Sequence, residues 1–174
     1  HAMLSVLQQY ECLYGTCIVM EVETGKIRAL VNLGRQKNGT YWEDFNYAMI
    51  PTEPGSTFKL VTLLALLKDK YININDKVNA QGGVMKFGRL TLRDSHLGLG
   101  VLIFKDAIAH SSNVAMAKLG YQYYGSKPEK YIEHLHDLHL NERTGIDLAG
   151  ERKPLVKTPK SKSWSATTLP WMAY

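Results

Sequence analysis

The stretch EPGSTFKLVTLLALLKDK, residues 53–70, decides how the rest of the sequence is interpreted. Nearly every residue in 60–67 is apolar, which predicts a helix over residues 56–70 that is buried on all sides. Two polar residues, Ser56 and Lys59, nevertheless stand at its beginning. Because they are three residues apart, just under one helical turn, their side chains are expected to point to the same side.

This pair has the spacing that a serine nucleophile and its own base require. A hydroxyl at a helix N-terminus lies among unpaired backbone N–H groups, which can stabilise an oxyanion. Burial and the positive helix end both disfavour an ammonium, so the pKa of Lys59 is expected to fall and its amine to accept the Ser56 proton. The alternative is an N-cap serine beside a lysine that reaches water, and chance alone supplies about one SxxK match in such a chain.

A second constellation, Ser111-Ser112-Asn113, lies between two expected helices over residues 101–110 and 114–124. A hydroxyl and an amide two residues apart on a tight connection can point into the same cleft. There the hydroxyl could relay a proton and the amide could hold a carbonyl or amide group of a substrate. Helix capping is the alternative, because Ser and Asn are favoured N-cap residues.

Composition predicts one globular domain over residues 1–174. The chain is 45% hydrophobic and 21% charged, which is enough for one core, and its net charge is +5. That mild basic excess is compatible with an anionic polymer or a membrane surface, and no nucleic-acid partner is expected. The sequence has no apolar run of the roughly 20 residues that cross a bilayer. Cys12 and Cys17 form no CxxC pattern and are expected to be reduced and partly buried.

The remaining pattern predicts few strands. The expected elements are the end of a helix over 3–12, strands over 16–22 and 26–33 around an ETG turn, loops and short strands over 73–93, a helix over 128–140, and loops after 144. A two-stranded hairpin alone is marginally stable. Strands that complete the sheet are therefore expected to be missing from the chain.

Three histidines, His134, His136 and His139, fall on the helix expected over 128–140. Their spacings differ from the four residues that zinc ligands on a helix prefer, so an ordinary surface helix is expected, with no metal site and no cofactor. His110 is interpreted as the C-terminal residue of a helix rather than a catalytic group.

The two constellations together resemble the motifs of the penicillin-recognising serine acyltransferases, which carry SxxK, then SxN, then a Lys-Thr/Ser-Gly strand. Four further stretches resemble the class B penicillin-binding proteins. They are GTCIVMEVETGKIRAL (15–30), NYA (46–48) shortly before EPGSTFK, HSSNVAMAKLG (110–120) and TGIDLAGE (144–151). The resemblance extends over essentially the whole chain.

This resemblance implies an α+β fold of the penicillin-binding-protein and β-lactamase type. The chain would hold the N-terminal β-hairpin and the helical subdomain, with the remaining strands of the sheet missing. The sequence contains no Lys-Thr-Gly or Lys-Ser-Gly. KTP at 157–159 cannot replace it, because proline does not supply an open strand edge, and RTG at 143–145 follows the second motif too closely. The chain is therefore expected to end before that strand.

The resemblance also implies a D,D-transpeptidase that cross-links peptidoglycan. Ser56 would attack the penultimate D-Ala of a D-Ala-D-Ala stem peptide, with Lys59 as base. Ser111 would pass the proton to the leaving D-Ala, and Asn113 would orient the peptide. An amine from a neighbouring stem peptide would then resolve the acyl-enzyme, whereas β-lactams would leave Ser56 acylated.

Three further expectations come with the resemblance. The partners would be stem peptides, β-lactams and, in the parent protein, proteins of cell-wall synthesis or division. The location would be the periplasmic face of a bacterial inner membrane, with the parent anchored by an N-terminal helix absent from this sequence. The 174 residues would acylate slowly or not at all, because one donor of the oxyanion hole belongs to the missing strand.

Two alternatives stay open from the sequence. The first is a β-lactam hydrolase or sensor with the same nucleophile: STFK at 56–59 also resembles the class D β-lactamases, although SSN at 111–113 does not fit them. A class A enzyme would need a glutamate that places a water, and Glu151 is instead interpreted as part of the turn in TGIDLAGE. The second alternative is a structural or interaction module without activity.

Overall fold

A computed structural model describes residues 1–88 and 90–174, which divide into two compact units. The first comprises His1–Thr52 and Gly145–Lys153, and the second comprises Glu53–Thr144 and Pro154–Tyr174. Together they contain both helices and strands, in keeping with the expected α+β class. The expectation of a single domain over residues 1–174 stays a prediction. No helix among the described residues combines the length and the apolar character that a bilayer crossing requires.

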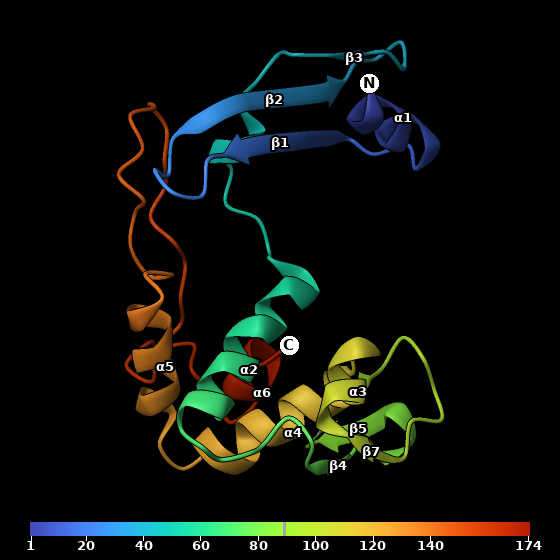
Figure 1. Cartoon of the computed structure of the whole chain (residues 1–174), viewed down its shortest axis with the longest axis vertical. Coiled ribbons are helices and arrows are strands. Elements are labelled where there is room, and N and C mark those ends of the chain that lie inside the picture. The colour runs from blue at the N-terminus through green and yellow to red at the C-terminus, as the bar shows by residue number, and fades with distance from the viewer. Residues whose placement is uncertain (89) are drawn as a thin grey trace. The chain divides into compact units, whose positions relative to one another are not determined.

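The first unit is built on an antiparallel sheet in the order β1-β2-β3 (Figure 1). Its elements are α1 (Ala2–Gln9), β1 (Tyr14–Met20), β2 (Ile27–Arg35), β3 (Tyr41–Trp42) and a 3₁₀ turn, η1 (Tyr47–Met49). The predicted hairpin is confirmed, and Gly25 adopts the positive φ of 69° that its turn needs. Both cysteines are free, but only Cys12 is partly buried. The expectation for Cys17 is wrong, because it lies on an exposed strand.

The NYA segment is fixed to this sheet by a buried amide. The Oδ1 of Asn32 accepts hydrogen bonds from the Thr16 hydroxyl at 2.8 Å and from the Ala48 backbone N–H at 3.3 Å. Gly34 lets the segment approach, since a Cβ at that position would lie 2.1 Å from the Tyr47 hydroxyl. Sequence positions from β1, β2 and η1 thus meet at one place within the unit.

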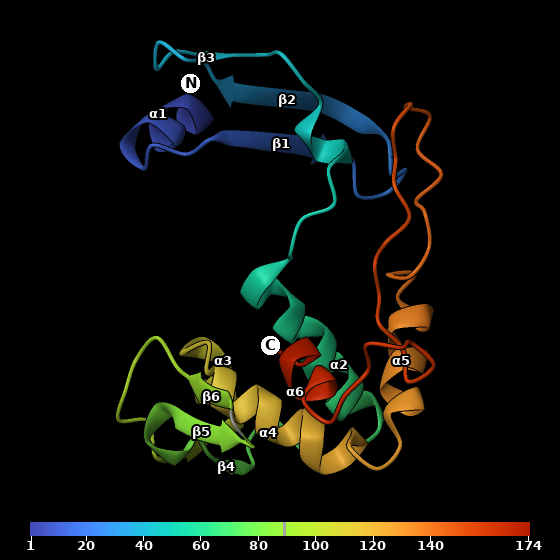
Figure 2. The same cartoon turned by 180° about the vertical axis from the view of Figure 1, so that it is seen from behind.

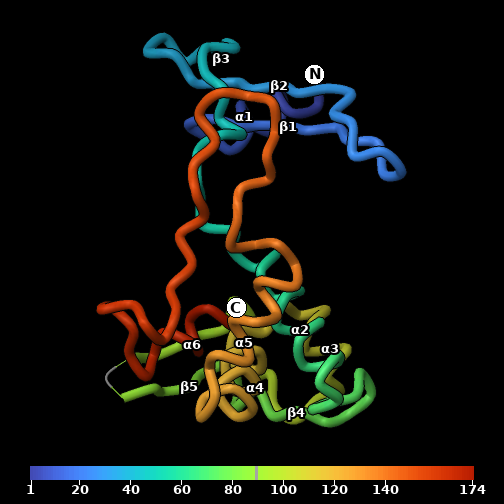
Figure 3. The backbone as a smooth tube through the Cα atoms, turned by 90° about the vertical axis from the view of Figure 1, so that its left-hand side faces the viewer, coloured from blue at the N-terminus to red at the C-terminus, as the bar shows by residue number. Residues whose placement is uncertain are grey.

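The second unit is mainly helical. Its helices are α2 (Lys59–Lys68), α3 (Phe104–Ala109), α4 (Asn113–Tyr124), α5 (Pro128–Asp137) and α6 (Thr168–Met172), and a 3₁₀ turn, η2 (Gly55–Phe58), precedes α2. Helices α4 and α5 lie next to each other (Figure 3). Helix α6 packs on α4, and the Thr62 hydroxyl of α2 donates to the carbonyl of Ala173 at 2.8 Å. The core between them contains Ala65, Leu66, Phe104, Ala107, Ala115, Met116, Tyr124, Tyr131 and Leu135.

Two short antiparallel strand pairs complete the second unit. Strand β4 (Lys77–Asn79) pairs with β7 (Val101–Ile103), and β5 (Val84–Phe87) pairs with β6 (Leu90–Arg93). Figure 2 shows the β5–β6 pair next to α4. The prediction of a helix from residue 101 is wrong at its start. The β-branched residues Val101 and Ile103 extend to pair with β4, and the helix begins only at Phe104.

Helix α2 is less buried than its sequence predicts. Val61, Ala65 and Leu66 face the core, but Leu60 is 56% exposed and Leu64 is 52% exposed. The two exposed leucines are four residues apart and therefore share one face of the helix. The expectation of burial on all sides is wrong for this face. An all-apolar composition does not reveal which side a helix turns toward its neighbours.

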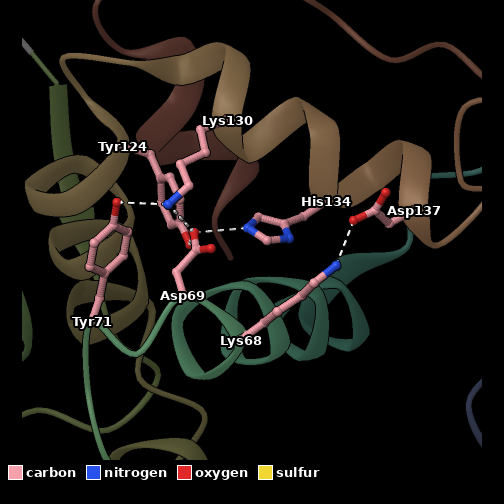
Figure 4. A network of polar contacts seen from close by, with 7 residues as sticks. All are labelled: Lys68, Asp69, Tyr71, Tyr124, Lys130, His134 and Asp137. Atoms are coloured by element: carbon pink, nitrogen blue, oxygen red, sulfur yellow. Dashed lines mark hydrogen bonds and ion pairs between the residues drawn. The ribbon is translucent and has the colours of Figure 1, made fainter.

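A partly buried carboxylate joins three of the helices (Figure 4). Asp69, directly after α2, accepts hydrogen bonds from the Tyr124 hydroxyl at 2.8 Å and from His134 Nε2 at 2.9 Å, and it forms an ion pair with Lys130 at 3.1 Å. Lys130 also lies over the ring of Tyr71. His134 is only 7% exposed, so the expectation of an ordinary surface helix is wrong at this histidine. Its partner is the carboxylate of a residue far away in the sequence.

Candidate active site

Ser56 stands in the turn η2, immediately before α2. Ser56 is exposed to solvent. The turn is stabilised by the Thr57 hydroxyl, which donates to the carbonyl of Pro54 at 2.6 Å. Gly55 has a positive φ of 58°, which glycine adopts readily and which allows the chain to enter the helix from Pro54. The nucleophile candidate is therefore accessible at a locally hydrogen-bonded helix start.

Lys59 begins α2 and is buried, with 5% of its surface exposed. Its Nζ lies 3.0 Å from Ser56 Oγ, 2.7 Å from the carbonyl oxygen of Ser111 and 2.8 Å from Ser111 Oγ. The structure thus brings together Ser56, Lys59 and Ser111. A lysine that reaches water, the alternative reading of the sequence, is wrong for this residue.

The surroundings of Lys59 suit an amine that exchanges a proton. Burial lowers the pKa of Lys59 from its ordinary value, and the negative charge of Asp94 partly opposes that shift. An ammonium donates to all three oxygens. A neutral amine has two N–H groups and one lone pair, and the Ser111 carbonyl can only accept. One of the two hydroxyls must then donate to the lone pair, and where that hydroxyl is the one of Ser56, the amine is placed to accept its proton.

Ser111 lies in the turn between α3 and α4 in a left-handed backbone conformation, with a φ of 52°. Its N–H donates to the carbonyl of Ile108 at 2.8 Å, and the N–H of Ser112 donates to that of Ala107 at 2.9 Å. A left-handed conformation costs an L-residue other than glycine roughly 1–2 kcal/mol. In this turn both the carbonyl and the hydroxyl of Ser111 bind the amine of Lys59.

Capping and binding are divided between the residues of the second motif. Ser112 is fully buried and caps α4, because its Oγ accepts from the Ala115 N–H at 3.0 Å. The capping alternative is therefore confirmed for Ser112. Asn113 is the first residue of α4 and is half-buried, and its Nδ2 donates to the carbonyl of Arg93, at the end of β6, at 2.8 Å. Asn113 is thus held against β6, next to the turn that binds Lys59.

Sequence reasoning missed Asp94, which follows β6 directly. It is 6% exposed, and its Oδ2 accepts from the Ser112 hydroxyl at 2.7 Å. Its Oδ1 accepts from the Val114 N–H at 2.8 Å. A single aspartate directly after a segment interpreted as loops and short strands gives no signal, because its partners are supplied by a distant turn.

Neither substitute for the third motif lies on a strand. The KTP residues at 157–159 begin a turn in which the Thr158 N–H donates to the Ser161 hydroxyl at 2.9 Å, and RTG at 143–145 is irregular. In the first unit, Glu151 Oε2 accepts from the Gly145 N–H at 3.2 Å. That bond fits the interpretation of TGIDLAGE as a turn.

The comparison with protein families gives a match over most of the chain. Residues 15–170 match the model of the penicillin binding protein transpeptidase domain. Stage V sporulation protein D of Bacillus subtilis is 33% identical over 100 residues, which are 57% of this chain and 15% of that protein. Penicillin-binding protein PbpB of Mycolicibacterium smegmatis is 28% identical over 163 residues, 88% of this chain and 24% of that protein. The chain thus spans about a quarter or less of each relative.

A solved structure shows the same fold. The TP domain of penicillin-binding protein 3 from Burkholderia pseudomallei superimposes with a TM-score of 0.80, at 22% sequence identity, over 99% of this chain and 48% of that one. The expectation of a transpeptidase-type α+β fold, covering part of a larger domain of that kind, is confirmed.

Proposed function

Because the chain belongs to the family of penicillin-binding protein transpeptidase domains, we propose that it carries the nucleophilic part of a serine D,D-transpeptidase that cross-links peptidoglycan. The single observation that supports this best is the position of the Lys59 amine, between the hydroxyls of Ser56 and Ser111 at 3.0 and 2.8 Å. A buried amine between two hydroxyls can take a proton from one and pass a proton through the other.

In the proposed acylation step, Ser56 Oγ bonds to the carbonyl carbon of the penultimate D-Ala of a stem peptide. The proton of Ser56 moves to Lys59 Nζ, and the C–N bond to the terminal D-Ala breaks. Ser111 Oγ passes a proton to the departing amine, and Lys59 restores the proton of Ser111. Asn113, held against β6 by its bond to the Arg93 carbonyl, orients the peptide.

In the second step, an amine from a neighbouring stem peptide attacks the ester carbonyl on Ser56. The new C–N bond cross-links the two peptides, the C–O bond to Ser56 breaks, and the proton of the amine returns through Lys59 to the serine. A β-lactam presents a strained amide to the same hydroxyl, and its acyl group stays on Ser56.

The oxyanion of both steps needs two donors. The backbone N–H of Ser56, at the start of α2, would supply one. The family's Lys-Thr/Ser-Gly strand would supply the other, and the sequence contains no such triplet. We therefore expect the 174 residues to acylate slowly, because one missing donor costs roughly 10²–10³ in rate.

The proposal extends to partners and location. The partners are D-Ala-D-Ala stem peptides, β-lactams and other proteins of cell-wall synthesis or division. The location is the periplasmic face of the inner membrane. A β-lactam hydrolase or sensor with the same Ser–Lys pair is the second candidate. A class A hydrolase would need a glutamate that places a water, and Glu151 fits that role less well, since its carboxylate binds the Gly145 N–H of its own turn.

Intact-mass spectrometry during prolonged exposure to penicillin tests the nucleophile. The chain should gain the mass of one penicillin over hours, Ser56→Ala should gain none, and the control Ser165→Ala, in a surface turn, should match the unsubstituted chain. An adduct on Ser56→Ala, or no adduct on the chain at saturating penicillin, would contradict the assignment of Ser56. Stoichiometric labelling within seconds would contradict the need for the second donor.

A further inference from the structure

We propose that Asp94 is a positioning residue of the acyl-transfer site, whose carboxylate holds the turn at residues 111–113 in the conformation that presents Ser111 to Lys59. The catalytic consequence rests on the proposed function. The structural part does not, because it concerns contacts that exist without a substrate.

One oxygen of the carboxylate binds the second motif, and the other binds the residue that follows it. Oδ2 accepts from the Ser112 hydroxyl at 2.7 Å, and Oδ1 accepts from the Val114 N–H at 2.8 Å. Ser112 and Val114 are completely buried, and Asp94 itself is 6% exposed. The N–H of Asp94 donates to the carbonyl of Gly83 at 2.9 Å, which anchors the aspartate in turn. Hydrogen bonds to an ionised acceptor are about twice as strong as those between neutral groups.

The turn needs such an anchor because its conformation is unfavourable by itself. Ser111 has a φ of 52°, a left-handed value that costs roughly 1–2 kcal/mol for a residue with a Cβ. Its N–H and that of Ser112 end α3 with bonds to Ile108 and Ala107. Asp94 binds Ser112 and Val114, which follow Ser111, so the strained serine is held by hydrogen bonds on both sides.

Asp94 also acts on Lys59 through its charge. Its negative charge raises the pKa of Lys59 against the larger lowering effect of burial. Among the residues that the structure describes, the groups within hydrogen-bonding distance of that amine, from η2 and from the α3–α4 turn, are the uncharged Ser56 and Ser111. Removing the charge alone and removing the anchor are therefore distinguishable changes.

Three variants of the chain separate these effects. Asp94→Asn keeps an oxygen that can accept from the Val114 N–H, and its NH₂ group can donate a hydrogen bond to the Ser112 oxygen. It lacks the negative charge. Asp94→Ala removes both. Asp137→Asn is the control, because Asp137 forms a surface ion pair with Lys68 outside the site.

The test measures two quantities by NMR that need no acylation. The first is exchange of the Ser111 and Ser112 amide protons, which Asp94 does not touch directly. The second is the titration of the Lys59 side chain in protein with labelled lysine, assigned by its absence from Lys59→Arg. In Asp94→Ala both amides should exchange at least about tenfold faster. In Asp94→Asn they should stay protected while the pKa of Lys59 falls, and in Asp137→Asn neither quantity should change.

Unchanged amide exchange in Asp94→Ala would overturn the positioning role. Should that variant fail to fold, Ser112→Ala removes the hydroxyl held by Asp94 and must expose the Ser111 amide in the same way. An unchanged pKa of Lys59 in Asp94→Asn would overturn the electrostatic part. If the NMR results are as expected but Ser56 never acylates, the proposed function fails while the role of Asp94 in the turn stands.

Discussion

The amine of Lys59 binds Ser111 twice, although 52 residues separate the two. Nζ lies 2.7 Å from the carbonyl oxygen of Ser111 and 2.8 Å from its hydroxyl. The bond to the carbonyl fixes the place of the amine in either protonation state, because a carbonyl only accepts. The bond to the hydroxyl can reverse its direction. Lys59 is thus anchored by one contact and can exchange protons through the other.

Substitution of Lys59 by arginine tests the base. A guanidinium stays protonated at any pH at which the protein is folded, so Lys59→Arg keeps the charge but cannot accept the Ser56 proton. We expect penicillin acylation to slow at least about a hundredfold, the usual range for loss of a general base. Lys68→Arg, in a surface ion pair on α2, is the matched control and should leave the rate unchanged. Intact-mass time courses measure both, and an unchanged rate in Lys59→Arg would remove the base from the mechanism.

Substitution of Ser111 separates conformation from chemistry. Glycine adopts a φ of 52° without strain, so Ser111→Gly should be more stable to unfolding than Ser111→Ala by about 1 kcal/mol. Both variants lack the hydroxyl and should acylate equally slowly. Urea denaturation gives the difference in free energy of unfolding. Equal free energies of unfolding would mean that the backbone of this turn relaxes in Ser111→Ala. Unequal acylation rates would mean that loss of the hydroxyl does not by itself set the rate of acylation.

The hydroxyl–amine spacing of Ser56 and Lys59 could be predicted because a helix fixes neighbours three residues apart by local geometry alone. The hairpin of β1 and β2 was equally local. The meeting of Lys59 with Ser111 came only from the resemblance to a family, since nothing in either segment specifies a partner so far along the chain. Asp94 and the burial of His134 could not be predicted, because each depends on a tertiary contact with a residue of unrelated sequence context.

Two short elements could not be predicted for the same reason. Val101 and Ile103 form a strand because β4 lies beside them, although the residues that follow continue as a helix. The expectation of loops after residue 144 is wrong for helix α6, Thr168–Met172. Its Pro170 is tolerated because the N–H groups of a first helical turn have no partner within the helix.

The pKa of Lys59 predicts how stability depends on pH. Burial lowers this pKa in the folded state, so the unfolded chain binds more protons between the folded value and the ordinary lysine value. The free energy of unfolding should therefore increase with rising pH across that window. The rate of acylation should rise over the same pH range, as the amine becomes neutral. Lys59→Met should lose this contribution in urea denaturation measured at several pH values. A slope retained in Lys59→Met would assign it to another group.

The pKa of Asp69 predicts a second dependence of stability on pH, in the acidic range. Burial raises its pKa, but hydrogen bonds from His134, Tyr124 and Lys130 outweigh burial and lower the pKa below its ordinary value. Its contribution to stability is therefore present above the unfolded pKa of about 3.9 and is lost as the pH falls through the folded pKa. Asp69→Asn should lower the free energy of unfolding at neutral pH by about 1–3 kcal/mol and should flatten the acid dependence.

The control for Asp69 is Asp137→Asn. Its surface pair with Lys68 should contribute no more than about 1 kcal/mol. Similar losses in the two variants would contradict a special role for the hydrogen bonds and ion pair of Asp69 that Figure 4 draws.

The central claim is that Ser56 carries the acyl group and keeps it until an amine arrives. Peptide mapping of the penicillin-treated chain, repeated at intervals after the free drug is removed, tests it most directly. An adduct should appear on the peptide that contains Ser56 and should persist for hours in water. An adduct on any other residue, or release from Ser56 within seconds as in a hydrolase, would contradict it.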